Sequence, residues 1–233
     1  MNVRLCPHVT PEVESAARHL TEFQTRKGFH LVAVHQYTHP EGLPWWWVVR
    51  LEGSEIEPAT GKKPKSIWPM RWTETGFELK RPEFGPEGAP LYGLDLLANY
   101  PAAWRWIVEG EKAADWLSFT LDAVAVLSWA GGAASVGRTD WRPLAGQCVV
   151  LWPDFDNGGF DAMRRIQDIL RGLGCFVLVL DVAAMDIPPK GDAVDFLERF
   201  REQSTGLVDH NMARARLAEV AFLRDVPEWR AAA

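Results

Sequence analysis

The stretch Val149–Gly159, which reads VVLWPDFDNGG, determines how the rest of this sequence is interpreted. It opens with an apolar run that is typical of a buried strand, and it ends in a turn rich in carboxylates and glycine. A helical pattern follows from about Gly158 to Gly172, with apolar residues recurring on one face. A buried strand, an acidic turn and a helix in this order predict one unit of a parallel α/β sheet.

Similar apolar runs precede and follow this unit, with helical stretches between them. The candidate strands are Trp104–Val108, Ala123–Ser128, Cys148–Trp152 and Cys175–Leu180. Short strands that alternate with helices form parallel sheets with crossover helices, so we predict an α/β fold with a mostly parallel sheet and flanking helices. One more helix is expected over Asn211–Leu223.

The first hundred residues have a less regular pattern. A helix is predicted over Thr10–Arg26, with Thr10 as its N-cap and Gly28 after its end. Four β-rich runs follow, the first two separated by a polar turn and therefore predicted to form a hairpin. These runs are Leu31–Tyr37, Trp45–Leu51, Ile67–Trp72 and Phe77–Leu79. We divide the chain into a small irregular α+β module (1–100), an α/β domain (101–205) and a C-terminal helical tail (206–233).

Composition limits the classes of function. The chain has 233 residues, of which 47% are hydrophobic and 24% charged, as in ordinary globular proteins. It contains no run long enough for a transmembrane helix and no secretory signal, so a cytoplasmic protein without a membrane partner is predicted. The net charge of −6 provides no overall basic field, so any contact with nucleic acid must be local. Cys148 and Cys175 lie in apolar runs and are predicted to be buried thiols.

Carboxylates follow two of the predicted strands. Glu109 follows the strand Trp104–Val108, and Asp154 and Asp156 follow Cys148–Trp152. Functional loops of parallel sheets lie beyond the carboxyl ends of the strands, and two carboxylates two residues apart suit a divalent cation with oxygen ligands. Taken singly, each residue also has a structural interpretation, as a helix N-cap or as a charge favoured by the helix dipole.

Other chemistries that use an Asp-x-Asp pair agree less well with the sequence. An EF-hand loop that begins at Asp154 requires Glu at its twelfth position, where this chain has Arg165. Haloacid-dehalogenase-like phosphatases usually carry Thr or Val four residues after the first Asp, where this chain has Gly158. The EF-hand is therefore excluded, and the phosphatase is kept as a minor alternative.

Two motifs carry a resemblance to a known family. Val108–Asp115 (VEGEKAAD), followed by Trp152–Asp156 (WPDFD), resembles the toprim domain, and within it the primase-like proteins of phages and mobile elements. The resemblance covers roughly Trp104–Phe200 and extends weakly upstream. It implies a compact α/β fold, with Glu109 as an acid/base or metal-linked glutamate and the two aspartates of the second motif as magnesium ligands.

A third acidic element of the family resembles Pro188–Asp195 (PPKGDAVD), which implies that Asp192 and Asp195 are further metal ligands. The aromatic residue that relatives often carry between the glycine and the first aspartate is absent here. The expected cofactor is Mg²⁺, with Mn²⁺ as an alternative. No zinc site is predicted, because the Cys/His module of many primases is missing.

The resemblance implies phosphoryl transfer by a primase-like nucleotidyltransferase that makes short RNA primers. Its expected partners are a single-stranded DNA template, NTPs and a replicative helicase. A magnesium-dependent nuclease on the same scaffold and a non-catalytic replication adaptor are the alternatives. A topoisomerase is disfavoured, because the three tyrosines all precede the toprim-like region. The sequence has no G-x-x-x-x-G-K-[ST] phosphate loop, so the chain is not expected to be an NTP-driven motor.

Two groups of cations are candidates for contact with nucleotide or nucleic acid. Lys112 and Arg138 flank the acidic site and are predicted to meet nucleotide phosphates. The stretch Gly61–Trp72 carries four cations and no acid, together with Trp68 and Trp72, which predicts a surface for single strands. These cations are Lys62, Lys63, Lys65 and Arg71. An equally weighted interpretation is a solvated loop whose tryptophans pack into a small core.

Overall fold

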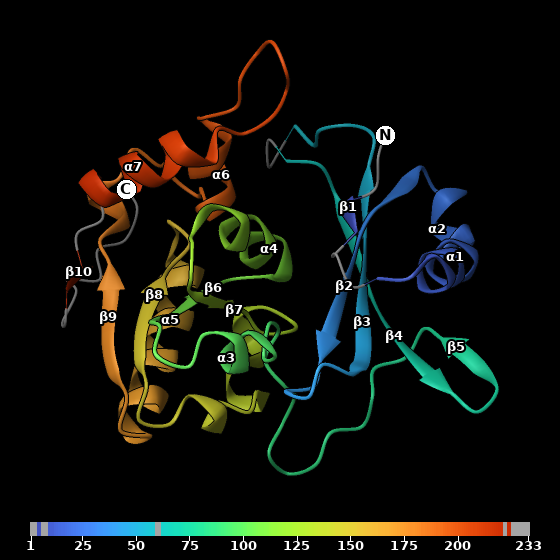
Figure 1. The fold of residues 1–233 in the computed structure, drawn as a ribbon. Coiled ribbons are helices and arrows are strands. Elements are labelled where there is room, and N and C mark those ends of the chain that lie inside the picture. Colours follow the sequence, from blue (N-terminus) through green and yellow to red (C-terminus); the bar gives the residue numbers. More distant parts are fainter. Residues whose placement is uncertain (1–3, 6–8, 59–61, 221–222, 225–233) are drawn as a thin grey trace. The chain divides into compact units, whose positions relative to one another are not determined.

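The computed structural model describes residues 4–5, 9–58, 62–220 and 223–224. The chain divides into two compact units, Met1–Phe84 and Gly85–Ala233, each built on its own five-stranded sheet (Figure 1). Of the residues discussed above, Gly61, residues 221–222 of the predicted helix Asn211–Leu223 and residues 225–233 of the predicted tail lie outside the described ones. Within the described residues that helix is confirmed over His210–Val220.

The first unit is an α+β module whose sheet follows the chain order β1-β2-β3-β4-β5. The strands are β1 (Arg4–Leu5), β2 (Phe29–Thr38), β3 (Pro44–Gly53), β4 (Lys65–Thr73) and β5 (Gly76–Glu78). β1 pairs with β2 in parallel, and the other neighbours are antiparallel. The predicted hairpin is confirmed by the pairing of β2 with β3, and the two later β-rich runs are confirmed as β4 and β5.

One side of this sheet packs against the first helix. Val13 and Ala17 of α1 (Pro11–Leu20) are buried with Val34, Val49 and Met70 in one apolar cluster. The N-cap prediction is confirmed, because the Val13 amide donates to Thr10 Oγ1 at 3.4 Å. Of the three adjacent tryptophans of β3, Trp46 and Trp47 are buried and Trp45 is exposed. Because successive side chains of a strand point to opposite faces, Trp46 and Trp47 are buried on different faces of this sheet.

The predicted helix Thr10–Arg26 is interrupted in the structure. α1 ends at Leu20, and a single turn, α2 (Glu22–Thr25), follows. The buried Thr21 hydroxyl between them donates to the Ala17 carbonyl oxygen at 2.7 Å. A threonine that bonds back to the preceding turn competes with the helical ladder, which accounts for the break.

The second unit is an α/β domain. Its sheet has the order β10-β9-β8-β6-β7, in which β6 to β9 are parallel and β10 is antiparallel to β9. The strands are β6 (Arg105–Val108), β7 (Ala125–Leu127), β8 (Cys148–Trp152), β9 (Phe176–Leu180) and β10 (Leu223–Arg224). The helices are α3 (Leu96–Asn99), α4 (Glu111–Thr120), α5 (Asn157–Gly172), α6 (Ala193–Glu198) and α7 (His210–Val220), with 3₁₀ turns η1 (Ala133–Arg138), η2 (Arg142–Leu144) and η3 (Val182–Ala184).

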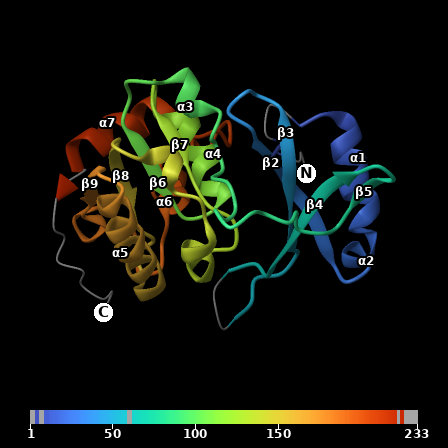
Figure 2. The same cartoon turned by 90° about the horizontal axis from the view of Figure 1, so that it is seen from below.

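Helices cover both faces of this sheet (Figure 2). On one face, Met163 and Ile166 of α5 are fully buried against Leu151, and each such side chain contributes about 1.5–3 kcal/mol. The next residue of β8, Trp152, points to the other face and packs edge-on against Phe196 of α6, with ring centroids 5.7 Å apart. The mostly parallel sheet with flanking helices is therefore confirmed.

Residues 85–100 belong to the second unit, whereas the sequence suggested a boundary at residue 100. Leu91 and Leu94 are buried in the α/β core, and Tyr92 forms an antiparallel bridge with Ser128. The Tyr92 hydroxyl also donates to Asp115 Oδ1 of α4 at 2.5 Å. Non-local pairing of this kind leaves no periodic signal in the sequence. Composition alone therefore groups residues 85–100 with the first module.

The two cysteines of the sheet differ in exposure. Cys175 is buried as predicted, and burial raises the pKa of its thiol. Cys148 is exposed, so the prediction of a buried thiol is wrong there. It is the first residue of β8 and lies at the amino end of that strand. No helix among the described residues combines the length and apolarity that a membrane span requires.

Candidate active site at the carboxyl ends of the parallel strands

Strand register places the first two acidic loops side by side. β6 and β8 are parallel neighbours, and Val108 is the Cα partner of Trp152. Glu109 follows Val108, and Pro153 and Asp154 follow Trp152. Adjacent strands lie about 4.8 Å apart, so Glu109 and Asp154 begin neighbouring loops at the same edge of the sheet. The register of β6 with β8 therefore brings the starts of these two loops together.

Glycines shape the loops around Glu109. Gly110, the next residue, has φ +85° and ψ 147°, a conformation open to glycine and strained for other residues, and it leads directly into α4. On the neighbouring strand end, an added Cβ at Gly132 would lie 3.4 Å from Glu109 Oε1. The Glu109 carboxylate therefore faces the loop that follows β7. Trp129 Nε1 holds that loop by donating to the Gly132 carbonyl oxygen at 2.8 Å.

The two aspartates after β8 have different local roles. Asp156 is the N-cap of α5, and its Oδ1 accepts a hydrogen bond from the Gly159 amide at 2.8 Å. Asp154 precedes this cap at the end of the strand, and its carbonyl oxygen accepts from the Asp156 amide at 2.8 Å. Both side chains are half-buried. The capping interpretation of Asp156 is therefore confirmed, and the cap occupies only one of its two carboxylate oxygens.

The third acidic loop is tied to the second by backbone hydrogen bonds. The Phe155 amide donates to the Gly191 carbonyl oxygen at 2.8 Å, and the Lys190 amide donates to the Phe155 carbonyl oxygen at 2.9 Å. Asp192 follows directly, so all three predicted acidic elements meet at one edge of the domain. Within the third loop, however, Asp192 and Asp195 are both engaged at the start of α6.

Asp192 and Asp195 form a reciprocal capping box. Asp192 Oδ1 accepts from the amides of Val194 and Asp195, at 2.7 and 3.0 Å. Asp195 Oδ2 in turn accepts from the Asp192 amide at 2.9 Å. Such an arrangement satisfies helix-start donors that would otherwise lack partners. It gives these two aspartates a structural role, and their role as metal ligands stays a prediction.

The carboxylates at this edge are the residues of the site that could hold a metal ion. Among the described residues, no group of three or more His, Cys, Asp or Glu side chains is gathered closely enough to hold a metal ion. Magnesium, however, usually keeps several waters and binds through one or two carboxylates together with substrate phosphates. Asp154 and the second oxygen of Asp156 match that number of carboxylates, whereas the Glu109 carboxylate faces the loop that follows β7.

Cationic side chains border this edge. Lys112 lies half-buried in the first turn of α4, and Arg138 is exposed at the end of η1, where its Nη2 donates to Ser135 Oγ at 3.2 Å. In the sequence, Arg165 of α5 serves only to exclude an EF-hand. In the structure its Nη1 donates to the Ala133 carbonyl oxygen at 3.3 Å, so it links α5 to η1. No sequence signal indicated this contact.

The basic stretch of the first unit is mixed in character. Lys62, Lys63 and Lys65 are exposed, but Arg71 is paired with Glu78 of β5 through its Nε, at 2.6 Å. The stretch itself contains no acidic residue. Its sequence does not reveal this partner, because Glu78 lies on the neighbouring strand β5. Trp68 packs against the core of the unit, with Phe23 5.3 Å from it edge-on.

Trp72 is 56% exposed at the end of β4, in edge contact with Phe77. Of the two tryptophans in the stretch, Trp72 is therefore the one that is open to a base. One tryptophan of the stretch belongs to the core of the unit and the other to its surface. The surface for single strands stays a prediction.

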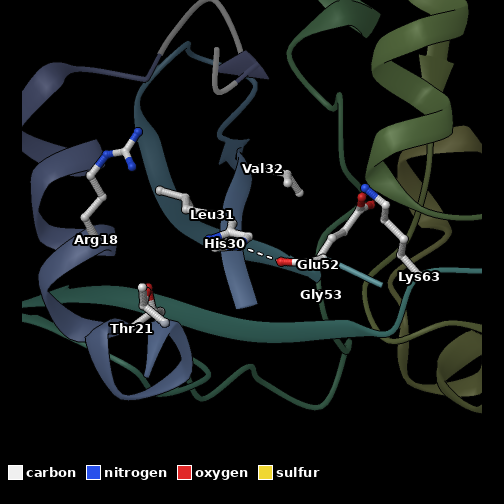
Figure 3. A pocket seen from close by; sticks show the side chains of 10 residues that line it. Arg18, Thr21, His30, Leu31, Val32, Glu52, Gly53 and Lys63 are labelled. Atoms are coloured by element: carbon white, nitrogen blue, oxygen red, sulfur yellow. Dashed lines mark hydrogen bonds between the residues drawn. The ribbon is translucent and has the colours of Figure 1, made fainter. Parts of the chain in front are cut away.

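A pocket of about 510 Å³ lies in the first unit between the α1–α2 junction and the ends of β2 and β3 (Figure 3). Lys63 and Arg18 line it, together with His30, whose Nε2 lies 2.8 Å from Ser54 Oγ. Glu52 contributes a carboxylate, and Arg18 is bonded to Glu14 on its own helix. Charges of both signs line the pocket, so its walls do not define an anion site.

Comparisons with known proteins identify the fold. No family model matches the sequence, and no curated protein matches it. The chain is similar to the zinc-binding and RNA polymerase domains of the Aquifex aeolicus primase, with a TM-score of 0.53 and 16% identity, over 92% of this chain and 51% of that one. This likeness confirms the predicted toprim-like α/β fold at the level of architecture.

Two further solved structures show weaker likeness. A DNA primase domain from Pseudomonas aeruginosa has a TM-score of 0.47 and 20% identity, over 82% of this chain and 51% of that one. The E. coli primase catalytic core has a TM-score of 0.46 and 16% identity, over 81% and 52%. The chain thus spans about half the length of the structures it matches. An origin in a phage or mobile element stays a prediction.

Proposed function

We propose that this chain is a primase-like nucleotidyltransferase that uses magnesium to make short RNA primers on single-stranded DNA. The observation that carries the proposal is the register of β6 with β8, which starts the loops of Glu109 and Asp154 at neighbouring strand ends. Carboxylates at this edge of a parallel sheet are where a catalytic site is expected. The fold shared with the Aquifex primase supports the same assignment.

The residues of the chain have distinct parts in the proposed reaction. Asp154 and the second oxygen of Asp156 would hold magnesium, which when bound supplies charge neutralisation for the triphosphate and activation of the attacking hydroxyl. Glu109 either completes the ligand set or accepts the proton of that hydroxyl. Asp192 and Asp195 start α6, which fixes the third loop against Phe155.

Cations at the border of the site are assigned to the substrate phosphates. Arg138 is exposed, and its guanidinium has the planar geometry that pairs with phosphate oxygens. Lys112, in the first turn of α4, supplies a second positive charge. Arg165 holds η1, which carries Arg138, and therefore acts by positioning.

Template contact is assigned to the first unit. Lys62, Lys63 and Lys65 supply charge for the backbone, and the exposed face of Trp72 supplies a surface on which a base can stack. Arg71 contributes less, because Glu78 neutralises it. Replacement of Lys63 and Lys65 by Ala should weaken binding of single strands about equally for all sequences and lower its salt dependence.

The test is primer synthesis by the purified chain. With single-stranded DNA, NTPs and Mg²⁺, the wild-type protein should make short oligonucleotides, and Asp154→Asn should reduce the rate by about a hundredfold or more. Asp168→Asn, an exposed carboxylate on α5, is the matched control and should retain the wild-type rate. An inactive wild-type chain under these conditions would contradict the proposal.

The same preparation separates the alternatives. If the wild-type chain degrades labelled DNA without NTPs and Asp154→Asn does not, the chain is a nuclease that uses the same residues, and the assignment of primer synthesis is wrong. Tight binding of single-stranded DNA that survives loss of Asp154, with no turnover of either kind, would indicate an adaptor. A helicase partner is a further prediction, to be tested by stimulation of primer synthesis on addition of a replicative helicase.

A further inference from the structure

Gly159 lies in the first turn of α5, at a place where its backbone does not require glycine. Its φ is not positive, and it is buried within a regular helix. Glycine is unfavourable in a helix relative to alanine, because it loses more conformational freedom on folding. A reason other than backbone conformation must therefore account for this residue.

The reason is close approach to Asp154. An added Cβ at Gly159 would lie 2.6 Å from the Asp154 carbonyl oxygen, 2.8 Å from its Cβ and 2.9 Å from its amide nitrogen. These distances are far inside van der Waals contact, and two of the three atoms belong to the backbone, which cannot rotate away. Any side chain at this position displaces either the start of α5 or the strand end that presents Asp154.

The same residue also holds the second aspartate. The Gly159 amide donates to Asp156 Oδ1 at 2.8 Å, which fixes the orientation of that carboxylate. Gly159 thus contacts the backbone of one acidic residue and the side chain of the other.

We propose that Gly159 is a positioning residue for the acidic site. The absence of a side chain sets where Asp154 stands, and the amide sets which oxygen of Asp156 is left for a cation. This inference rests on the proposed function, because it assumes that the two aspartates bind magnesium. Residues that orient metal ligands typically change metal affinity by about 10- to 100-fold when they are altered.

The alternative is that Gly159 serves only the packing of α5 on the sheet. The two roles differ in what they affect: a packing role changes the unfolding temperature, whereas a positioning role changes metal affinity at a given stability. α5 offers two matched controls. Gly172, its last residue, has open space where a Cβ would be, and a Cβ at Gly158 would meet only Asp156 Oδ1, at 3.3 Å.

The experiment titrates the full chain with Tb³⁺ as a probe for the magnesium site and follows luminescence sensitised by nearby tryptophan. Gly159→Ala should weaken Tb³⁺ binding by about tenfold or more, Gly158→Ala by less, and Gly172→Ala not at all. Thermal unfolding of each variant, followed by circular dichroism, shows whether the fold is kept. Wild-type affinity in a folded Gly159→Ala protein would overturn the inference.

A measurement on the wild-type chain covers the case in which Gly159→Ala does not fold. In a Mg²⁺ titration followed by ¹H–¹⁵N spectra, the Gly159 amide should shift among the most strongly affected signals, since its acceptor is a ligand. Binding of Mg²⁺ without a shift of this amide would overturn the inference.

The two proposals fail in different ways. If Tb³⁺ does not bind the wild-type chain, or binds Asp154→Asn equally well, the proposed metal site is wrong, and the assignment of Gly159 is lost with it. If the wild-type chain binds Tb³⁺ through Asp154 and Gly159→Ala binds it equally well, only the positioning role is overturned.

Discussion

The loops 153–159 and 188–195 look alike in sequence, since each carries two aspartates near the start of a helix. In the structure the two loops differ in how many of their aspartates cap the helix. The start of α5 is capped by Asp156 alone, and Asp154 stands before it at a strand end beside the loop of Glu109. The start of α6 is capped by Asp192 and Asp195 together. We therefore propose that the pair before α5, in which only Asp156 caps the helix, is the one that binds metal.

The strands that precede the two loops differ in the same sense. β8 ends directly before Asp154 and pairs with β6 as far as Val108 and Trp152. β9 is followed by η3 and a further segment before Asp192 is reached, and backbone hydrogen bonds with Phe155 tie this third loop to the second. Register fixes the first loop, whereas the third is held by contacts that a shift of the loop would break.

The largest effect should separate the two pairs. Asp154→Asn is expected to weaken Tb³⁺ or Mn²⁺ binding by about a hundredfold, because it removes a full charge at the proposed site. Asp195→Asn should change metal affinity less than about threefold, since an amide oxygen can still accept the Asp192 amide. Isothermal titration with Mn²⁺ measures both. Equal losses in the two variants would show that both loops bind metal.

An intermediate effect is expected at Asp156, which combines a cap with a proposed ligand. Asp156→Ser keeps a good N-cap and should retain stability, while metal affinity falls by about tenfold. Asp156→Ala should lose the same affinity and, in addition, about 1 kcal/mol of unfolding free energy. Denaturant unfolding and Mn²⁺ titration of the two variants check this. If Asp156→Ser kept the full metal affinity, Asp156 would only cap α5 and would not be a metal ligand.

A smaller effect, confined to stability, is expected at Asp192. Asp192→Ala should lower the free energy of unfolding by about 1 kcal/mol, and Asp192→Ser should restore most of it. Metal affinity should be close to wild type in both. If Asp192→Ser were as stable as wild type but failed to bind Mn²⁺, the prediction of Asp192 as a ligand would be supported and the contrast between the loops would be wrong.

The smallest effect should come from a carboxylate that belongs to neither loop. Hydrogen bonds from Arg142, through Nε at 2.8 Å and Nη2 at 2.9 Å, hold the pKa of Asp140 below its ordinary value. A lowered pKa in the folded state stabilises the fold above the unfolded pKa, and this contribution is lost as pH falls through the lowered value. Because the Arg142 side chain is 60% exposed, Asp140→Asn should cost less than about 1 kcal/mol.

The difference between wild type and Asp140→Asn in unfolding free energy should therefore be present at neutral pH and vanish in acid. Urea titrations at several pH values measure it. A difference that grows as the pH falls would show that the sign of this assignment is wrong.

Much of the α/β unit could be predicted because its signals are local. The bounds of β8 agree with the predicted strand, and α5 begins one residue before the predicted helix. The position of Glu109 and Asp154 at neighbouring strand ends could be predicted, because the carboxyl ends of parallel strands lie at the same edge of a sheet. What the sequence did not show depends on distant partners: Tyr92 with Ser128, Arg71 with Glu78, and Gly159 with the backbone of Asp154.

Other differences arise where a local signal has two meanings. The residues around Thr21 favour a continuous helix, yet the Thr21 hydroxyl donates a hydrogen bond to the Ala17 carbonyl oxygen and the helix ends there. Cys148 belongs to an apolar run, yet it is exposed at the amino end of β8. The aspartates before α5 and α6 match both a cap and a ligand. In such cases the three-dimensional partner decides, and the sequence alone supplies the alternatives.

The most direct test of the central claim is a crystal of the chain soaked in MnCl₂, with anomalous differences used to locate the cation. The account predicts a peak in contact with Asp154 and either Glu109 or Asp156. A peak at Asp192 and Asp195 alone, or no peak at the carboxyl edge of the sheet at a concentration that saturates binding in solution, would contradict it.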